Sequence, residues 1–295
     1  MPVSPINPMN DASHVTAPLG EAGSGRVRYG AAMALYADGK LSAEQLECFR
    51  IASADDALDA AEVMRERGLP LPPAQAPSGE ALIRALVEEV DVYLGKLPGP
   101  GIAEVRNGLQ AYRSVPFNQP KPANNAVVQQ HLPAALAAAA QTEPALTALM
   151  SATAPLLNWI AYDLYDREVI GESFATSHAY CTLLGGEGAF RVGDYDLGLF
   201  LIAPHVLYRD HRHPAPELYA PLTGPHGWRF KPGAPLTIKQ AHEPVWNEPN
   251  QHHLTKVGPV PFFCIFGWTR DTDKPAEVLP ATDWPQIEAA RISIG

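Results

Sequence analysis

The sequence predicts an α+β protein in which a helical N-terminal region precedes a small antiparallel β-barrel. Up to residue 168, apolar side chains recur at helical spacing between Pro- and Gly-rich linkers. After residue 168 the period changes, and short runs of β-branched and aromatic residues alternate with Gly, Pro and Asp turns. Such a series of short runs is typical of a barrel or jelly roll. We therefore expect a disordered arm over 1–25, an α-helical domain over 26–168 and a β-barrel domain over 169–295.

The expected helices carry apolar residues on one face, and several have a start or stop signal. Ser42 is placed to cap one helix, and Gly68 to end the next. A Ser78-Gly-Glu80 start precedes the clearest amphipathic segment. The expected helical segments are 31–36, 42–51, 55–67, 80–90, 102–112, 134–140, a turn at Leu146, and 155–165.

The expected strands lie in the second half of the chain. They are 174–184, 197–208, 217–223, 228–231, 236–240, 252–257 and 262–268. A barrel built from them encloses one ligand cavity and fixes side chains from several strands around it.

Composition restricts the class of partner. The chain has 295 residues, 46% of them hydrophobic and 18% charged, which is typical of a globular protein. Its formal net charge of −10 argues against a nucleic-acid partner, because phosphates would be repelled, and is compatible with a small cationic or zwitterionic substrate, of which a zwitterionic one is expected. Three widely spaced cysteines, no secretory leader and no apolar run of membrane-spanning length predict a cytoplasmic protein without a membrane partner; a homodimer is left open.

Potential metal ligands gather between Tyr208 and Tyr219. His211 and His213 share one face of a strand, and a carboxylate, Glu217, follows four positions later. Two imidazoles and a carboxylate suit a divalent transition metal that keeps open positions for a substrate. If Glu217 faces the metal, Tyr219 faces the same cavity because side chains alternate along a strand.

A fourth ligand is expected from the segment Asn250-Gln-His-His253. His252 and His253 cannot both point inward from a regular strand. The spacing to Trp268 favours His253 as the inward residue.

These residues carry a resemblance to a known family. The pattern His211-x-His213-x3-Glu217-x6-Gly224 resembles the first motif of the cupin superfamily. A longer pattern resembles the dimethylsulfoniopropionate (DMSP) lyase branch of cupins. It includes Tyr208 before the first motif, and Val245-Trp-Asn-x-Pro-Asn-Gln-x-His253 and Phe266-Gly-Trp268 after it. The resemblance covers residues 197–271 and departs from the general cupin pattern at His205 and at Pro249-Asn-Gln251.

The resemblance implies a C-terminal cupin barrel with assigned site residues. A divalent metal would be held by His211, His213, Glu217 and His253, and Tyr219 would act as the base. Tyr208 and Trp268 would line the substrate pocket, with Trp228 or Tyr195 as further candidates for an aromatic cage around a sulfonium. One divalent transition metal ion is expected, and Fe, Zn, Mn, Co and Ni all suit this ligand set.

The implied function is that of a metal-dependent carbon–sulfur lyase. It would cleave DMSP, or a close analogue, by β-elimination to dimethyl sulfide and acrylate. Two other hypotheses stay open: a cupin isomerase or dioxygenase acting on another small carboxylate, and a non-catalytic metal cupin that binds a small molecule. Turnover without oxygen separates a lyase from a dioxygenase, and a Tyr219→Phe change separates a lyase from a binding protein.

Overall fold

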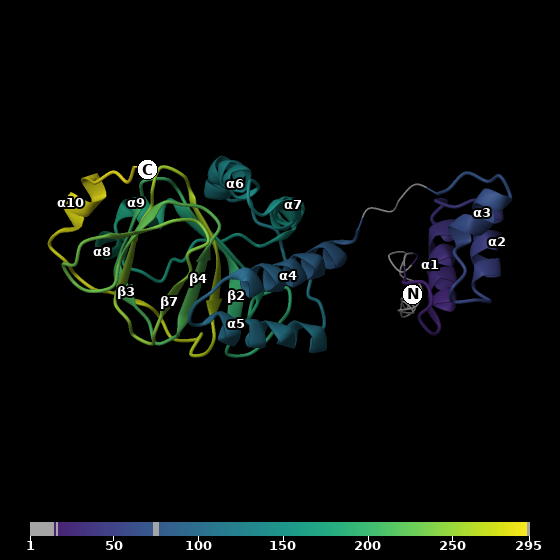
Figure 1. Ribbon diagram of the computed structural model, residues 1–295, viewed down its shortest axis with the longest axis horizontal. Helices are drawn as coiled ribbons and strands as arrows, with labels where there is room; N and C mark the ends of the chain where they lie inside the picture. Colours follow the sequence, from purple (N-terminus) through teal and green to yellow (C-terminus); the bar gives the residue numbers. More distant parts are fainter. Residues whose placement is uncertain (1–14, 16, 73–76, 294–295) are drawn as a thin grey trace, which may run out of the picture. The chain divides into compact units, whose positions relative to one another are not determined.

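The computed structural model describes residues 15, 17–72 and 77–293. Most of the predicted N-terminal arm, residues 1–14 and 16, lies outside this part of the chain. The chain divides into two compact units, Met1–Ser78 and Gly79–Gly295 (Figure 1). Among the described residues, no helix combines the length and apolar character needed to cross a bilayer.

The first unit is a small helical bundle. Its helices are α1 (Ser24–Ala37), α2 (Ala43–Ala52) and α3 (Ala60–Glu66). Ser42 caps α2 as predicted: its side chain accepts from the Gln45 N–H, and the Gln45 side chain accepts from the Ser42 N–H. The predicted helix at 55–67 begins only after Asp59, because the Asp55 side chain instead accepts from the Ala57 N–H in a preceding turn.

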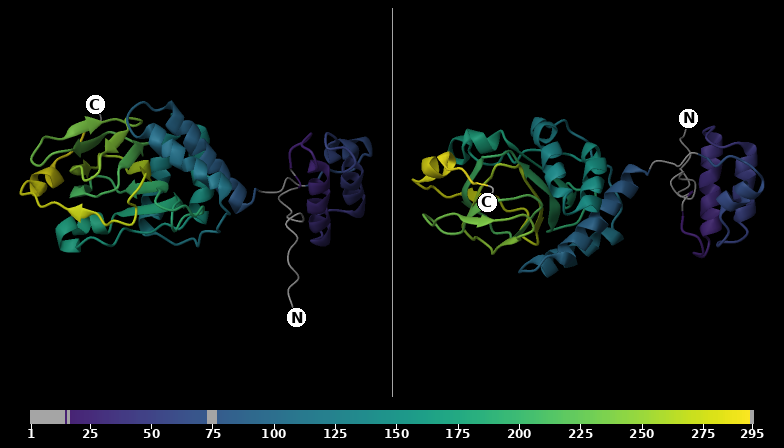
Figure 2. Two further views of the ribbon diagram at one scale, coloured as in Figure 1. Left: turned by 90° about the horizontal axis from the view of Figure 1, so that it is seen from below. Right: turned by 45° about the horizontal axis from the view of Figure 1, so that its top comes forward.

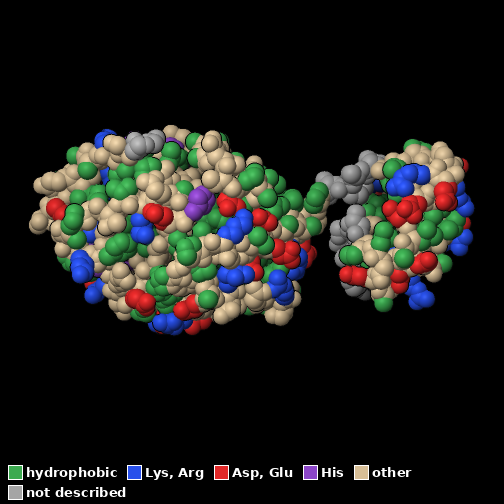
Figure 3. All heavy atoms as spheres, in the orientation of Figure 1, with side chains coloured by type: hydrophobic (Ala, Val, Ile, Leu, Met, Phe, Trp, Pro, Cys, Tyr) green, Lys and Arg blue, Asp and Glu red, His purple; other side chains and the backbone are tan. Residues whose placement is uncertain are grey.

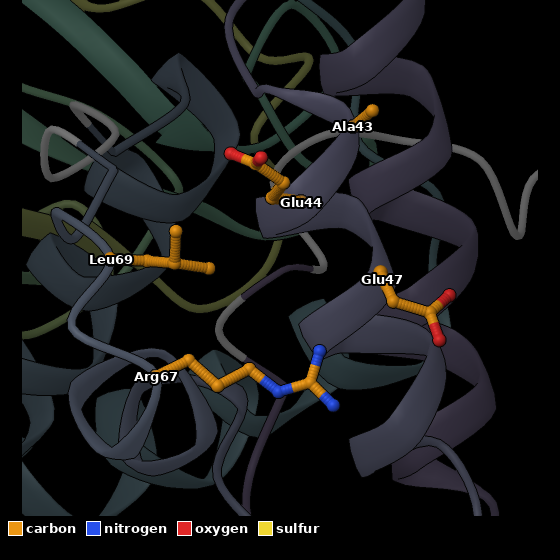
Figure 4. Close-up of a pocket in the computed structure, with 5 residues that line it drawn as sticks. All are labelled: Ala43, Glu44, Glu47, Arg67 and Leu69. Carbon is orange, nitrogen blue, oxygen red and sulfur yellow. The ribbon is translucent and has the colours of Figure 1, made fainter.

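A shallow hollow of about 350 Å³ lies on this unit (Figure 4). It is lined by Ala43, Glu44, Glu47, Arg67 and Leu69, and the Arg67 guanidinium extends toward Glu47. This lining offers carboxylates but no imidazole or thiolate, so it differs in chemistry from the metal site that the sequence predicts.

The second unit begins with helices that precede the sheets. They are α4 (Gly79–Lys96), α5 (Ile102–Leu109), η3 (Gln110–Ser114), α6 (Ala126–Ala139), α7 (Pro144–Thr153), η4 (Ala154–Leu156), α8 (Arg167–Ile170) and α9 (Glu172–Ala175). Helix α6 starts earlier than the predicted 134–140, because the Asn125 side chain caps it and Pro133 is accommodated inside it. The predicted helix at 155–165 is wrong beyond Leu156. Ile160 instead pairs with Tyr180 through two backbone hydrogen bonds of 2.8 and 2.9 Å.

The described strands form two five-stranded antiparallel sheets. The first has the order β1-β2-β9-β4-β7 and the second β10-β3-β8-β5-β6. The strands are β1 (His178–Leu184), β2 (Asp196–Ile202), β3 (Leu207–Arg212), β4 (Glu217–Pro221), β5 (His226–Arg229), β6 (Thr237–Lys239), β7 (Val245–Asn247), β8 (His253–Lys256), β9 (Phe262–Trp268) and β10 (Glu277–Val278). The short helix α10 (Trp284–Ala289) follows. This is the predicted α+β class with a C-terminal jelly roll (Figures 1 and 2).

Several strand predictions need correction. The predicted strand at 174–184 begins only at His178, because Glu172–Ala175 form the short helix α9. The predicted strand at 197–208 is two strands, because the chain leaves the first sheet after β2 and enters the second at β3. His205 lies between them with a positive φ of 66°, a conformation that a continuous strand excludes. The short strands β7 and β10 were not predicted, since a few residues give no measurable alternation.

Alternation along the first sheet separates two cores. Leu199, Leu201 and Leu218 face the cluster formed with helices α4–α7, while Phe200 and Tyr219 face the space between the sheets. Helix α6 contacts β1, β2 and β9, so helices cover the outer face of this sheet (Figures 1 and 2). The inner faces of both sheets therefore enclose a separate aromatic core, and all predicted site residues belong to these strands or their ends.

Sterics explain why the predicted motif has a glycine at Gly224. A Cβ at Gly224 would lie 2.3 Å from the backbone nitrogen of Ala241, so no side chain fits there. The three cysteines, Cys48, Cys181 and Cys264, are free and buried. On the face seen in Figure 3, acidic and basic side chains are interspersed.

Candidate active site

Three histidine side chains converge between the sheets. His211 in β3 and His253 at the start of β8 are opposite each other in the strand pairing, and His213 follows the end of β3. Their ligand atoms lie within 4.8 Å of one another. All three residues are buried, with 3% exposure or less. The structure thus brings together the three imidazoles that the sequence singled out.

Glu217 reaches the same point from the opposite sheet. Its Oε2 lies 3.1 Å from Nε2 of His213 and 3.4 Å from Nε2 of His253. In the sheet register, Glu217 is flanked by Trp268 on β9 and Asn247 on β7. The Trp268 Nε1–H donates to Oε1 at 2.8 Å and the Asn247 Nδ2–H to Oε2 at 3.2 Å. Two fixed donors therefore hold this buried carboxylate toward the histidines.

Backbone carbonyls orient all three imidazoles. The Nδ1 atoms of His211, His213 and His253 lie 2.8, 2.7 and 2.8 Å from the carbonyl oxygens of Arg209, Ala215 and Gln251. Because a carbonyl oxygen only accepts hydrogen bonds, each Nδ1 carries a proton, and in the neutral ring Nε2 then presents a lone pair. Fixing the tautomer through the other ring nitrogen is the usual arrangement behind metal-ligating histidines.

The arrangement fits a divalent metal ion. Nε2 of His211 and Nε2 of His253 are buried and have no hydrogen-bond partner among the described residues. Nε2 of His213 faces a carboxylate oxygen of Glu217 at 3.1 Å, a contact in which either a proton or a metal ion can lie between the two atoms. Buried polar groups without partners are costly, and one cation accepting electron pairs from all four groups would satisfy them. Three imidazoles and a carboxylate form a donor set typical of first-row divalent metals.

Burial and mutual charge set the ionisation of these groups. Burial lowers the pKa of His211 well below its usual range and also lowers the pKa of His253. Burial opposes the charged form of His213, but the Glu217 carboxylate outweighs it and raises the pKa of His213. For Glu217 burial acts in the raising direction, but the charge and hydrogen bond of His213 hold its pKa well below the usual range. The Glu217 side chain is therefore an anion, and the His211 imidazole is neutral and can offer an electron pair to a metal ion.

Tyr219 lies where the alternation of β4 predicts. It is two residues after Glu217, 4% exposed, with its ring centroid 6.4 Å from that of His253. Burial, and then the charge of Glu217, raise the pKa of Tyr219 well above its usual range. The phenol is therefore protonated unless positive charge is placed beside it.

Tyr208 lies against the histidine cluster. Its ring stacks on His211 with centroids 3.9 Å apart, and its hydroxyl is 2.6 Å from the hydroxyl of Tyr165. Burial raises the pKa of Tyr208 well above its usual range. Tyr165, from the segment before α8, was not predicted as a site residue, because nothing in its local sequence indicates that it folds over β3.

The predicted aromatic cage is only partly assembled. Trp268 lies over His213 with ring centroids 4.6 Å apart, and Trp228 packs against Tyr219 at 5.6 Å. Tyr195 does not belong to this group. Its hydroxyl donates to the carbonyl oxygen of Val105 in α5, and its ring packs in the core beneath the helices. The suggestion that Tyr195 lines the cage is therefore wrong.

The two neighbouring histidines face opposite ways. His253 points into the cluster, whereas His252 hydrogen-bonds the Asp210 carboxylate on the other side of the second sheet. Arg212, between the two histidines of the first motif, also points away and pairs with Glu277 at 2.8 Å. Asp210 and Asn247 are further buried polar residues around the cluster that the sequence alone did not single out.

The chain matches a family model described as dimethylsulfoniopropionate lyase over residues 106–264, more than half of its length. No curated protein sequence matches.

Solved structures show the same fold. A structure reported as DMSP lyases RdDddP and RnDddQII shares 20% identity and a TM-score of 0.51, and the match covers 69% of this chain and 100% of that one. The DMSP lyase DddQ from Ruegeria pomeroyi DSS-3 shares 18% identity and a TM-score of 0.50, covering 67% of this chain and 95% of that one. These similarities confirm the predicted fold, and the family match shows that the chain belongs to the dimethylsulfoniopropionate lyase family.

Proposed function

We propose that this protein is a metal-dependent carbon–sulfur lyase that cleaves DMSP, or a close analogue, by β-elimination to dimethyl sulfide and acrylate. The observation that carries the proposal is the enclosed cluster of three imidazole Nε2 atoms and the Glu217 carboxylate, bordered by tyrosine and tryptophan rings. Membership of the DMSP lyase family supports this substrate.

In this proposal His211, His213, Glu217 and His253 hold one divalent metal ion. When bound, the ion supplies positive charge that polarises the substrate carboxylate and lowers the pKa of a neighbouring phenol. Glu217 itself is kept in place by Trp268 and Asn247. Fe, Zn, Mn, Co and Ni all suit this donor set.

Tyr219 is the proposed base. With the bound ion beside it, the phenol would first lose its proton to solvent, and the phenolate oxygen would then take the proton from the carbon α to the substrate carboxylate. The electron pair of that C–H bond becomes the new Cα=Cβ double bond, the Cβ–S bond breaks, and its electrons leave on sulfur as dimethyl sulfide. Acrylate remains, and Tyr219 returns the proton to solvent, so the reaction needs no oxidant.

Aromatic faces suit the cationic end of the substrate. A sulfonium is attracted to the electron-rich face of tyrosine and tryptophan rings. Trp268 presents such a ring beside His213, and Trp228 packs against Tyr219 in the same core. The Tyr208 ring is stacked between His211 and Phe174, so Tyr208 would border the substrate with its edge. The surrounding core excludes water, which strengthens every charge interaction in the site.

The test is product formation from DMSP by purified, metal-loaded protein in the absence of oxygen. We expect dimethyl sulfide in the headspace and an equal amount of acrylate in solution. Turnover only with oxygen would favour a dioxygenase, and metal binding without turnover would favour a binding protein. A cytoplasmic location and a homodimer remain predictions for cell fractionation and sedimentation experiments.

A further inference from the structure

The two histidine-bearing strands of the second sheet are paired through an irregular register. Tyr208 pairs with Thr255, and His211 pairs with His253. Three steps along β3 therefore match two steps along β8, which places one extra residue, a β-bulge, at residues 209–210. In a regular strand Tyr208 and His211 would point to opposite faces. Because of the bulge, their rings stack 3.9 Å apart in the site.

The bulge residue Asp210 is fixed from the side of the sheet away from the site. Arg229 Nε donates to its Oδ1 at 3.0 Å, and Arg229 Nη2 hydrogen-bonds Oδ2. Trp284 Nε1 donates to Oδ2 at 2.7 Å, and His252 Nε2 hydrogen-bonds Oδ1. The side chains of Asp210 and Arg229 are fully buried. Each carboxylate oxygen thus has two partners.

These partners connect three neighbouring strands. Asp210 is in β3, His252 directly precedes β8, and Arg229 is in β5, and these strands are adjacent in the order β3-β8-β5. Asp210 precedes His211 by one residue, as His252 precedes His253. One carboxylate therefore restrains the backbone next to two of the proposed metal ligands at once.

We propose that Asp210 is a positioning residue for the metal centre: with Arg229, His252 and Trp284 it holds the β3 bulge in the geometry that directs His211 and His253 toward one ion. The inference rests on the proposed metal site, but it does not depend on DMSP being the substrate. It differs from a purely structural role, because a buried ion pair that only stabilised the fold would leave metal affinity in the folded protein unchanged.

The test is Co²⁺ binding to Asp210→Asn, followed through the visible absorption of the bound ion. This change keeps the size of the side chain but turns one acceptor into a donor facing other donors. We expect the Kd for Co²⁺ to rise by about 10- to 100-fold, the scale found for losing residues that orient metal ligands. The Co²⁺ spectrum should change in protein whose circular dichroism is that of the wild type.

A matched control lies on β10, the strand that pairs with β3 on its other side. Glu277→Gln removes a carboxylate that pairs with Arg212 of β3, but this pair is exposed and outside the bulge. We expect wild-type Co²⁺ affinity and spectrum for this variant. Equal weakening in Glu277→Gln and Asp210→Asn would overturn the inference, because the effect would then be a general loss of charge near β3.

A milder variant covers the case in which Asp210→Asn does not fold. Trp284→Phe removes one donor to Asp210 and keeps a ring against the Arg209 guanidinium, which lies 4.7 Å from the Trp284 ring. We expect weaker Co²⁺ binding here too. Wild-type affinity in folded Asp210→Asn, or in Trp284→Phe if the former is insoluble, would overturn the inference. The two proposals can also fail separately. If these variants bind Co²⁺ more weakly but the metal-loaded wild type releases no dimethyl sulfide from DMSP, the inference is supported and the proposed lyase activity is contradicted.

Discussion

Glu217 and Trp268 lie directly opposite each other on β4 and β9, and the Trp268 indole donates a 2.8 Å hydrogen bond to the Glu217 carboxylate. Glu217 is 3% exposed, so water does not replace a lost donor readily. Trp268 thus has two roles in the proposal: it orients a metal ligand with its N–H, and it offers its ring to the substrate cation.

Trp268→Phe separates the N–H from the ring. We expect metal affinity to fall by about tenfold or more, because an outer hydrogen bond to a ligand is lost while the aromatic packing on His213 is kept. Competition with a chelator measures this. Trp246→Phe is the control, since the Trp246 indole donates to the exposed Glu248. Similar affinity losses in both variants would contradict the assignment.

Tyr219→Phe tests the proposed base. The change keeps the ring in the core and deletes only the hydroxyl, so we expect metal content and melting temperature close to those of the wild type. Turnover should fall about a hundredfold or more, the scale expected for loss of a general base. Tyr195→Phe is the control because its hydroxyl contacts Val105 in the helical layer. Near-normal turnover in Tyr219→Phe would move the base elsewhere, with Tyr208 as the next candidate.

We expect Asp196 to make the stability of the fold depend on pH. Burial raises the pKa of this carboxyl at the start of β2 from 3.8 to about 7, with a smaller contribution from Asp194. Between about pH 4 and 7 the folded state therefore keeps a proton that the unfolded state has lost, so stability falls as pH rises through this window. Asp196→Asn, which stays neutral, should melt at a higher temperature than the wild type at pH 8, with the difference shrinking toward pH 4.

The measurement is the melting temperature of both proteins across that range. Asp273→Asn changes an exposed carboxylate beside Lys274 and is the matched control. Parallel curves for wild type and Asp196→Asn would show that this carboxyl does not titrate differently on folding.

Local patterns predicted the parts of the structure that depend on neighbouring residues in the chain. The cap at Ser42 follows from a serine placed directly before a helical apolar pattern, and the shared face of Glu217 and Tyr219 follows from strand alternation. The convergence of His211, His213 and His253 was expected from the motif resemblance, and the geometry agrees with it.

Other features depend on contacts between distant segments. Residues 157–165 leave the helical path because Ile160 pairs with Tyr180. Asn247 acts on Glu217 only through the register of β4 and β7. The β3 bulge could not be predicted for the same reason, because an extra residue is defined only by comparison with the partner strand. The donors that hold Asp210 also come from distant parts of the sequence, as far away as Trp284.

The most direct test of the central claim is dimethyl sulfide release measured while divalent metal is added stepwise to metal-free protein with DMSP. We expect release to rise with added metal and to saturate near one equivalent per chain, and a folded Glu217→Ala, His253→Ala double variant to release none. His131→Ala, which changes a histidine on α6, is the control and should behave as the wild type. Dimethyl sulfide release that is independent of added metal, or that persists in the double variant, would contradict the account.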